Sequence, residues 1–152
     1  MEEIERLQDN LLLIRKATGW SATELGDKIG VTRQTINNLE SKTKKYKLNK
    51  TQYIALRSVF DAEINKSPED TKMLVDLLDM LIDNPDKYDA KDKENLLKKA
   101  NMIIPSILEG TTSRKDVSDE FESVMKNLGI VIGSAVGVGA AAWLVTILKQ
   151  KK

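Results

Sequence analysis

Apolar side chains recur every three or four residues along most of this chain, which is the spacing of amphipathic helices. They form a compact stretch over residues 4–64, an acidic stretch over 67–109 and a further helix that begins near Ser113. Apart from an uninterrupted apolar run over 129–148, every periodic segment has the helical repeat. The pattern therefore predicts an all-α protein with three segments, at 1–65, 66–112 and 113–152.

The middle segment opens with residues that typically start a helix. Ser67 is placed to cap it, Pro68 suits its first helical position, and Asn84 with Pro85 favours its end. One apolar stripe runs along this predicted helix and consists of Met73, Leu74, Leu77, Leu78 and Leu81.

A second helix is predicted within residues 89–110, where Pro105 is expected to kink it and Gly110 to end it. Its apolar positions are Leu96, Leu97, Ala100, Ile103, Ile104, Ile107 and Leu108. Together the two helices predict a hairpin whose stripes either cover each other or pair between two subunits, because a lone hairpin has little core. The second arrangement predicts a homodimer.

The most specific pattern is the string WSATELGDKIGVTRQTINNLE, at residues 20–40. Ser21 and Glu24 have the spacing of a capping box at the start of a short helix. Gly26 allows another helix to approach closely, and Gly30 can adopt the left-handed conformation that turns the chain. Thr32 then caps a further helix. The outward positions of that helix are Arg33, Gln34, Thr35, Asn37 and Asn38.

This string resembles the Cro/C1-type repressors, the XRE-like helix-turn-helix proteins, and the resemblance extends over residues 11–64. It implies a five-helix-type domain that inserts the helix starting at Thr32 into the major groove of double-stranded DNA. Two positions differ from the family's habit: Gly26 stands where alanine is usual, and Ala22 where a glutamine that helps to grip phosphate is common. The second difference implies a weaker hold on the DNA backbone at that end.

The resemblance also implies which side chains touch DNA. Arg33, Gln34 and Asn38 fall where the family reads base edges. The residue types suit that role, because arginine can fork onto guanine while glutamine or asparagine can pair with adenine. The residues expected at the DNA backbone, or in mixed roles, are Ser21, Thr23, Thr32, Thr35, Asn37, Lys42, Lys44, Lys45 and Lys47.

Positive charge is concentrated directly after this helix, in the stretch SKTKKYKLNK at residues 41–50. No acid lies between Glu40 and Asp61. A lysine run is often an ordinary solvated loop, but its place after a polar helix favours contact with phosphates. Tyr46 within it either anchors the loop or donates to a phosphate.

Residues 128–148 carry no charge and have about the length that a helix needs to span a bilayer. Their small residues Gly129, Gly133, Gly137 and Ala141 are spaced by four, which favours close packing with a second helix. No helix breaker separates this run from the amphipathic residues 113–127. The sequence therefore predicts one long helix that runs from the amphipathic part into the membrane.

Other interpretations of this run stay open: a helix buried in a soluble oligomer, or an interfacial or pore-forming element. The lysine-rich end opposes a span, because it would face outward if the DNA-binding side is cytoplasmic. The string GVGAAA at 137–142 matches a dinucleotide-binding fingerprint only formally, since too few residues follow it for a second strand.

Composition favours binding over catalysis. The chain has 152 residues and a net charge of +1, so nucleic-acid contact has to depend on local charge. It has no cysteine and no histidine, which removes disulfides, thiolate sites, the usual general base and the commonest transition-metal ligand. We therefore expect no catalytic residue, no metal and no cofactor. The amino terminus lacks a secretory signal, which predicts a cytoplasmic start.

These observations predict a sequence-specific transcriptional regulator of repressor type. Its DNA-binding domain is expected to be cytoplasmic and attached to the inner membrane through residues 128–148. The expected partners are double-stranded DNA, the membrane and a second copy of the chain, and the sequence indicates no particular small-molecule ligand. Two alternatives remain: a membrane-anchored protein whose helix-turn-helix domain binds a protein such as a cytoskeletal filament, and a soluble dimeric repressor with a buried terminal helix.

Overall fold

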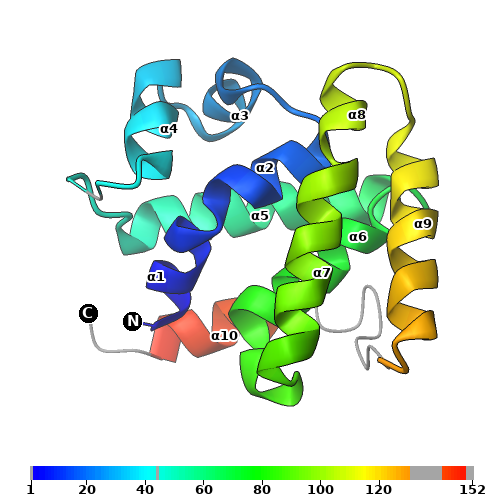
Figure 1. Cartoon of the computed structure of the whole chain (residues 1–152). Coiled ribbons are helices and arrows are strands. Elements are labelled where there is room, and N and C mark those ends of the chain that lie inside the picture. The colour runs from blue at the N-terminus through cyan, green and yellow to red at the C-terminus, as the bar shows by residue number, and fades with distance from the viewer. Residues whose placement is uncertain (1, 44, 131–141, 150–152) are drawn as a thin grey trace.

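The computed structural model describes residues 2–43, 45–130 and 142–149, and every regular element in these ranges is helical (Figure 1). The prediction of an all-α fold is confirmed. In chain order the elements are α1 (Glu2–Asp9), α2 (Leu11–Thr18), α3 (Ala22–Ile29), α4 (Arg33–Glu40), α5 (Lys50–Lys66), α6 (Lys72–Leu78), the π-helical turn η1 (Asp79–Asp83), the 3-10 turn η2 (Pro85–Lys87), α7 (Ala90–Ile103), α8 (Pro105–Leu108), α9 (Arg114–Asn127) and α10 (Ala142–Lys149).

The boundaries of α3 and α4 follow from short-range hydrogen bonds. The hydroxyl of Ser21 accepts from the backbone N–H of Glu24 at 3.1 Å, and the Glu24 carboxylate accepts from the backbone N–H of Ser21 at 2.9 Å. Gly30 ends α3 with φ of 81°, and the Thr32 hydroxyl caps α4 by accepting from the N–H of Thr35. The predicted capping box, turn glycine and second cap are all confirmed.

The first five helices enclose the amino-terminal part of the core. Trp20 is buried there and stacks against Phe60 with ring centroids 6.3 Å apart, so it is a packing residue. The other large side chains fully buried in this part are Leu7, Leu11, Ile14, Leu25, Ile36, Tyr53 and Leu56.

The predicted start of the next helix is wrong. Ser67 ends α5 instead, because its N–H donates to the carbonyl of Glu63 at 2.9 Å. The chain then turns, with the Thr71 hydroxyl donating to the carbonyl of Ser67 at 2.8 Å, and α6 begins at Lys72. The physical reason is that the apolar face of α5 continues as far as buried Ile64, so the helix extends up to the residue expected to open the next one.

The apolar stripe of α6 and η1 is covered within one chain. Met73, Leu74, Leu77, Leu78 and Leu81 are all buried. The stripe packs against α2 and α9, and α7 in turn packs against α8 and α9 (Figure 1). A second subunit is therefore not needed to cover this stripe, and the homodimer stays a prediction.

One carboxylate is buried in this packing. Asp76 of α6 is 3% exposed, and among the described residues its Oδ2 has no hydrogen-bond partner. Burial raises the pKa of Asp76 to about 8, and the neighbouring carboxylate of Glu122 on α9 adds to the shift. The group is therefore largely protonated at neutral pH.

The helix breaks expected near residue 105 are confirmed. Helix α7 ends at Ile103 and α8 begins at Pro105, since proline lacks the N–H that would continue the helix. Gly110 follows α8 with φ of 75°. Ser113 then caps α9, its hydroxyl accepting from the N–H of Asp116 at 3.1 Å.

The prediction of one long helix from residue 113 into the apolar run is wrong. Helix α9 ends at Asn127, and Gly129 has φ of 76°, a left-handed conformation that turns the chain. Gly129 is therefore no part of a small-residue helix face, while Gly133, Gly137 and Ala141 lie outside the described residues. Within the described ranges, no helix is both long and apolar enough to cross a membrane.

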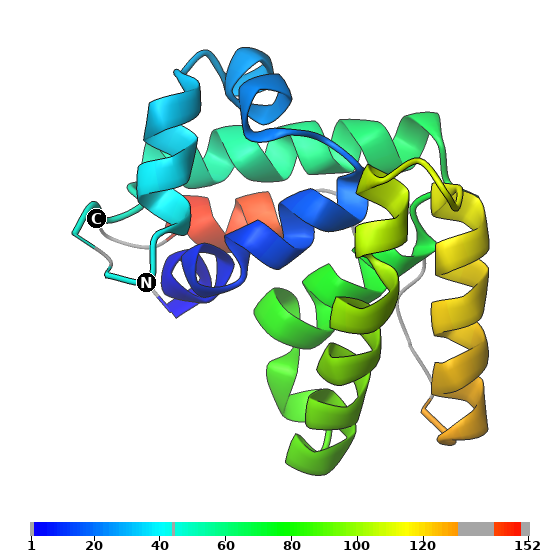
Figure 2. The ribbon, with the colours of Figure 1, turned by 45° about the horizontal axis from the view of Figure 1, so that its top comes forward.

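The described part of the ending, α10, packs against α5. Trp143 and Ile147 are buried, and the indole N–H of Trp143 donates to the carboxylate of Asp61. The Trp143 ring meets Tyr53 edge-on with centroids 6.0 Å apart, and the guanidinium of Arg57 lies 5.1 Å from the same ring. Figures 1 and 2 show α10 on the opposite side of α5 from α3. These contacts agree with the alternative of a terminal helix buried in protein.

Candidate nucleic-acid interface

The outward face of α4 carries the residues expected to read bases. Arg33 and Gln34 are exposed, and Asn38 is half-buried. The side-chain amide of Gln34 donates to Oδ1 of Asn38 at 2.9 Å, which is the contact expected of side chains one helical turn apart. This bond leaves the Gln34 oxygen as an acceptor and the Asn38 amide as a donor, the two groups that bind an adenine edge.

Arg33 stands at the first position of α4 with its guanidinium in solvent. No acid or carbonyl in the described part of the chain pairs with it. An unpaired guanidinium at the amino end of an exposed helix can fork onto guanine or contact phosphate.

The residues expected at the DNA backbone divide into two groups. Ser21, Thr23 and Thr32 are exposed and Thr35 is half-buried at or near the starts of α3 and α4, and Asn37 is exposed in the second half of α4. The hydroxyls of Thr32 and Thr35 lie 3.0 Å apart. Hydrogen bonds from the backbone N–H and the side chain of Ser21 hold the pKa of Glu24 below its usual value. Because that carboxylate is charged at neutral pH, it opposes phosphate binding at the start of α3.

The second group belongs to the lysine loop, defined here as residues 41–49. Lys42, Lys45 and Lys47 are exposed, and Lys44 lies outside the described residues. The Lys45 ammonium lies 5.7 Å from the centroid of the Tyr46 ring. Tyr46 is 49% exposed, so its side chain is not buried as a loop anchor would be.

A buried ion pair holds α4 to the rest of the domain. Nε and Nη2 of Arg15 on α2 donate to the two carboxylate oxygens of Glu40, at 2.6 and 3.0 Å. Nη1 of Arg15 donates to the carbonyl of Trp20 at 2.9 Å. One guanidinium thus joins α2, the end of α4 and the approach to α3, which fixes the angle at which α4 is presented.

A buried amide on α1 holds the lysine loop. The Gln8 side-chain N–H₂ donates to the carbonyls of Leu39 and Tyr46 at 3.1 and 2.6 Å, and its oxygen accepts from the N–H of Leu48 at 2.9 Å. The sequence gives no signal for this residue or for the Arg15 pair. Their partners lie at least 25 positions away, beyond the reach of any helical spacing rule.

The turn between α3 and α4 is tight at Gly26. A Cβ at that position would lie 2.6 Å from the carbonyl oxygen of Val31 and 3.3 Å from the carbonyl carbon and oxygen of Thr32. Gly26 does allow a close approach, but by the backbone of the turn that leads into α4 and not by another helix as predicted.

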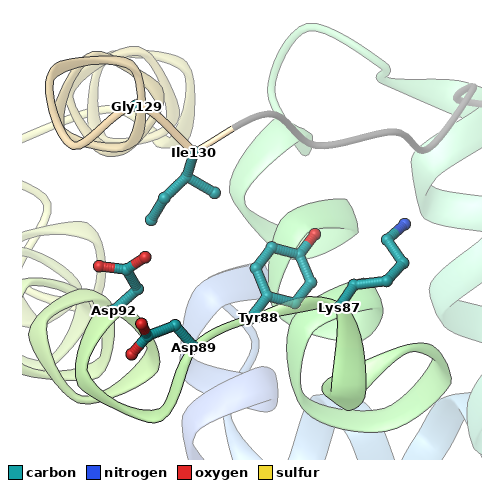
Figure 3. Close-up of a pocket in the computed structure, with 6 residues that line it drawn as sticks. All are labelled: Lys87, Tyr88, Asp89, Asp92, Gly129 and Ile130. Carbon is teal, nitrogen blue, oxygen red and sulfur yellow. The ribbon is translucent and has the colours of Figure 1, made fainter.

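A pocket of about 220 Å³ lies elsewhere, at the start of α7 (Figure 3). Figure 3 shows Asp89 beside Asp92, with Lys87 pointing away from them. No group of three acids suited to a metal ion occurs among the described residues. The lining residues are Lys87, Tyr88, Asp89, Asp92, Gly129 and Ile130, of which only Gly129 carried a prediction, as a packing residue of the expected membrane helix.

Residues 11–64 match the model of a helix-turn-helix family. The matched segment comprises α2 to α5 and has the bounds of the expected Cro/C1-type resemblance, which is therefore confirmed. No curated protein and no solved structure is similar enough to the chain to count as a match. The family match supports a DNA-binding regulator of the XRE type, a class that is generally not enzymatic.

Proposed function

We propose that this protein is a sequence-specific transcriptional regulator of repressor type that binds double-stranded DNA as a homodimer. The observation that carries the proposal is the surface of α4. Arg33 and Gln34 are exposed and Asn38 is half-buried on that helix, and the exposed lysines of the loop follow its carboxyl end.

The dimensions of α4 suit the major groove. An α-helix with its side chains is about 10–12 Å across, and the groove is about 12 Å wide. With α4 in the groove, the lysine loop leaves its carboxyl end on the side where the sugar-phosphate backbone passes. Base contacts then specify the site, whereas the loop lysines supply affinity that does not depend on sequence.

A homodimer follows from the short reach of one such helix. A single α4 contacts only a few base pairs, and helix-turn-helix proteins lengthen the site by pairing half-sites about 34 Å apart. Repression requires only that the bound dimer exclude other proteins from the same DNA. The proposal includes no membrane anchor, because α10 packs against α5 and no helix of the described residues is long and apolar enough to span a membrane.

The test is selection of duplexes from a random library by the full chain, followed by titration against the selected duplex and a shuffled one. We expect the selected sequence to bind at least about a thousandfold more tightly, which is typical of specific recognition. A chain that enriches no sequence and binds both duplexes equally would contradict the proposal. Equal binding would indicate contact with the DNA backbone alone, whereas binding to neither duplex would favour the alternative in which the α4 surface contacts a protein.

Variants separate the two kinds of contact. Arg33→Ala and Gln34→Ala should each relax the preference at one base position, at a cost of about 1–3 kcal/mol. Joint replacement of Lys45 and Lys47 by alanine should weaken binding to both duplexes and lower the salt slope by up to about 2. Lys98→Ala, at an exposed position on α7, is the control for a lysine outside the interface.

A further inference from the structure

We propose that Gln8 is a positioning residue of the DNA interface, which holds the lysine loop against the end of α4 in the form that meets the DNA backbone. The inference rests on the proposed DNA binding. It also assigns part of the interface to α1, which lies outside the segment that matches the family.

The three hydrogen bonds of Gln8 all go to main-chain atoms. Two of them, to the carbonyl of Tyr46 and the N–H of Leu48, hold the loop on either side of Lys47. The third, to the carbonyl of Leu39, holds the last turn of α4. Because one rigid amide makes all three, it fixes the position of the loop backbone relative to the helix.

Apart from Gln8, the contacts that hold this loop lie at its two ends, and at the carboxyl end Asn49 forms a capping box with Gln52. Leu48 is the one buried side chain among its described residues. At its start, the Ser41 hydroxyl lies 3.0 Å from that of Thr43 and accepts from the backbone N–H of Thr43 at 3.3 Å, and the N–H of Ser41 donates to the carbonyl of Asn38. Without Gln8 the loop backbone would sample several conformations, and ordering it on DNA would reduce affinity.

Gln8 is presented from a fixed helix. Arg6, half a turn before it, donates through Nε and Nη2 to the carbonyl of Ile82 in η1 at 3.0 and 2.7 Å. Ile4 and Leu7 of α1 are buried. In Figure 2, α1 lies beside the carboxyl end of α4, and contacts between α1 and α4 are present. The helical segment after α5 therefore supports the lysine loop through α1.

The test is the variant Gln8→Met in the full chain, which keeps the length of the side chain and removes its hydrogen bonds. We expect about a tenfold loss of affinity for the selected duplex and an equal loss for the shuffled one, so that their ratio is unchanged. The slope of log K against log salt should fall by about 1, the value for one lost phosphate contact. Asn95→Met, an exposed amide on α7, is the matched control and should bind like the wild type.

A second measurement does not depend on DNA. In Gln8→Met the amide hydrogen of Leu48 should exchange faster, and trypsin should cleave sooner after the loop lysines, while the circular dichroism stays that of the wild type. If Gln8→Met does not fold, Gln8→Asn replaces it, because it shortens the reach by one carbon but keeps the amide.

Three results decide between the claims. A wild-type chain that binds neither duplex would end the proposed function together with this inference. A wild type that binds DNA, beside a folded variant with unchanged affinity, salt slope and Leu48 exchange, would overturn the inference alone. A changed ratio between the selected and shuffled duplexes would also overturn it, since Gln8 would then act on base reading.

Discussion

Alanine at position 26 tests how closely the turn packs against α3. The new Cβ would lie 2.6 Å from the carbonyl oxygen of Val31, a distance that real Cβ atoms essentially never show. That carbonyl is backbone, so the contact cannot be relieved by a side-chain rotation. The N–H of Val31 also donates to the carbonyl of Gly26 at 2.9 Å, and a shift of the turn would strain this hydrogen bond.

The expected magnitude is a difference between two effects. Alanine in place of a helical glycine stabilises a helix by about 1 kcal/mol. Forcing an extra carbon into a closed contact costs about 1–3 kcal/mol, and weakening the Val31 hydrogen bond adds about 0.5–1.5 kcal/mol. We therefore expect Gly26→Ala to lower the free energy of unfolding by about 2 kcal/mol. It should also displace the start of α4 and weaken binding to the selected duplex.

Gly30→Ala is the matched control, because it tests the effect of backbone conformation where an added Cβ makes no steric contact. Position 30 has φ of 81°, but no atom would lie within 4 Å of a Cβ added there. Alanine should therefore lower the free energy of unfolding only by the cost of holding it in the left-handed conformation, about 1–2 kcal/mol. Both variants are compared with the wild type by urea unfolding, followed by circular dichroism. If Gly26→Ala is as stable as the wild type or more so, the turn yields freely and the reasoning from the close contact is refuted.

Three further predictions concern buried groups. Arg15→Met should lower the free energy of unfolding by about 3–5 kcal/mol, because it leaves the buried carboxylate of Glu40 without its partner. The control Lys98→Met, at an exposed position, should lower it by less than about 1 kcal/mol. Equal effects of the two variants in urea unfolding would contradict this prediction. Asp76 has a folded pKa of about 8 against 3.8 in the unfolded chain, so the folded state binds the extra proton between these values. Stability should therefore fall as pH rises from 5 to 8, by up to about 1.4 kcal/mol per pH unit, and Asp76→Asn should flatten this dependence in urea unfolding at each pH. Trp143→Ala should lower the free energy of unfolding by about 3 kcal/mol. Val145→Ala, at a half-exposed position of α10, should lower it by less than about 0.5 kcal/mol. A Trp143→Ala variant of wild-type stability would show that α10 does not pack as described.

The helix-turn-helix motif was predictable because its signals are local. The caps at Ser21, Thr32 and Ser113 satisfy backbone N–H groups three residues away, and Gly30 supplies a left-handed conformation at one position. Each signal can be recognised within a few residues of sequence. The outward surface of α4 follows from helical periodicity, and the structure leaves Arg33 and Gln34 exposed and Asn38 half-buried on it.

The supports of this surface were not predictable. Gln8 and Arg15 act across 25 to 40 residues, and neither residue type in a short helix indicates a long-range partner. The start of α6 was misjudged for a related reason. Ser67 before Pro68 is a valid helix start, but the same serine can also end the preceding helix, and packing of the α5 face decided between these roles.

The apolar ending shows a different limit. A run without charge suits a lipid bilayer and a protein core equally well, so its length alone does not separate the two. The spacing of glycines by four suggested one smooth helix face, but Gly129 instead adopts φ of 76° and turns the chain after α9. What fixes α10 is a set of partners on α5, above all Tyr53 and Asp61, which no property of the run itself reveals.

Although the net charge of the chain is only +1, its arginines differ in whether they pair with other groups of the fold. All five lie in the described part of the chain. Four of them have partners: Arg6 binds Ile82 and Glu2, Arg15 binds Glu40, Arg57 binds Asp83, and Arg114 binds Glu63. Their positive charge is therefore largely neutralised within the fold. Arg33 has no such described partner, and it stands at the start of α4, the helix that leads into the exposed loop lysines. The balance of the whole chain thus leaves a locally basic surface, and the salt dependence of DNA binding should follow that surface instead of the total charge.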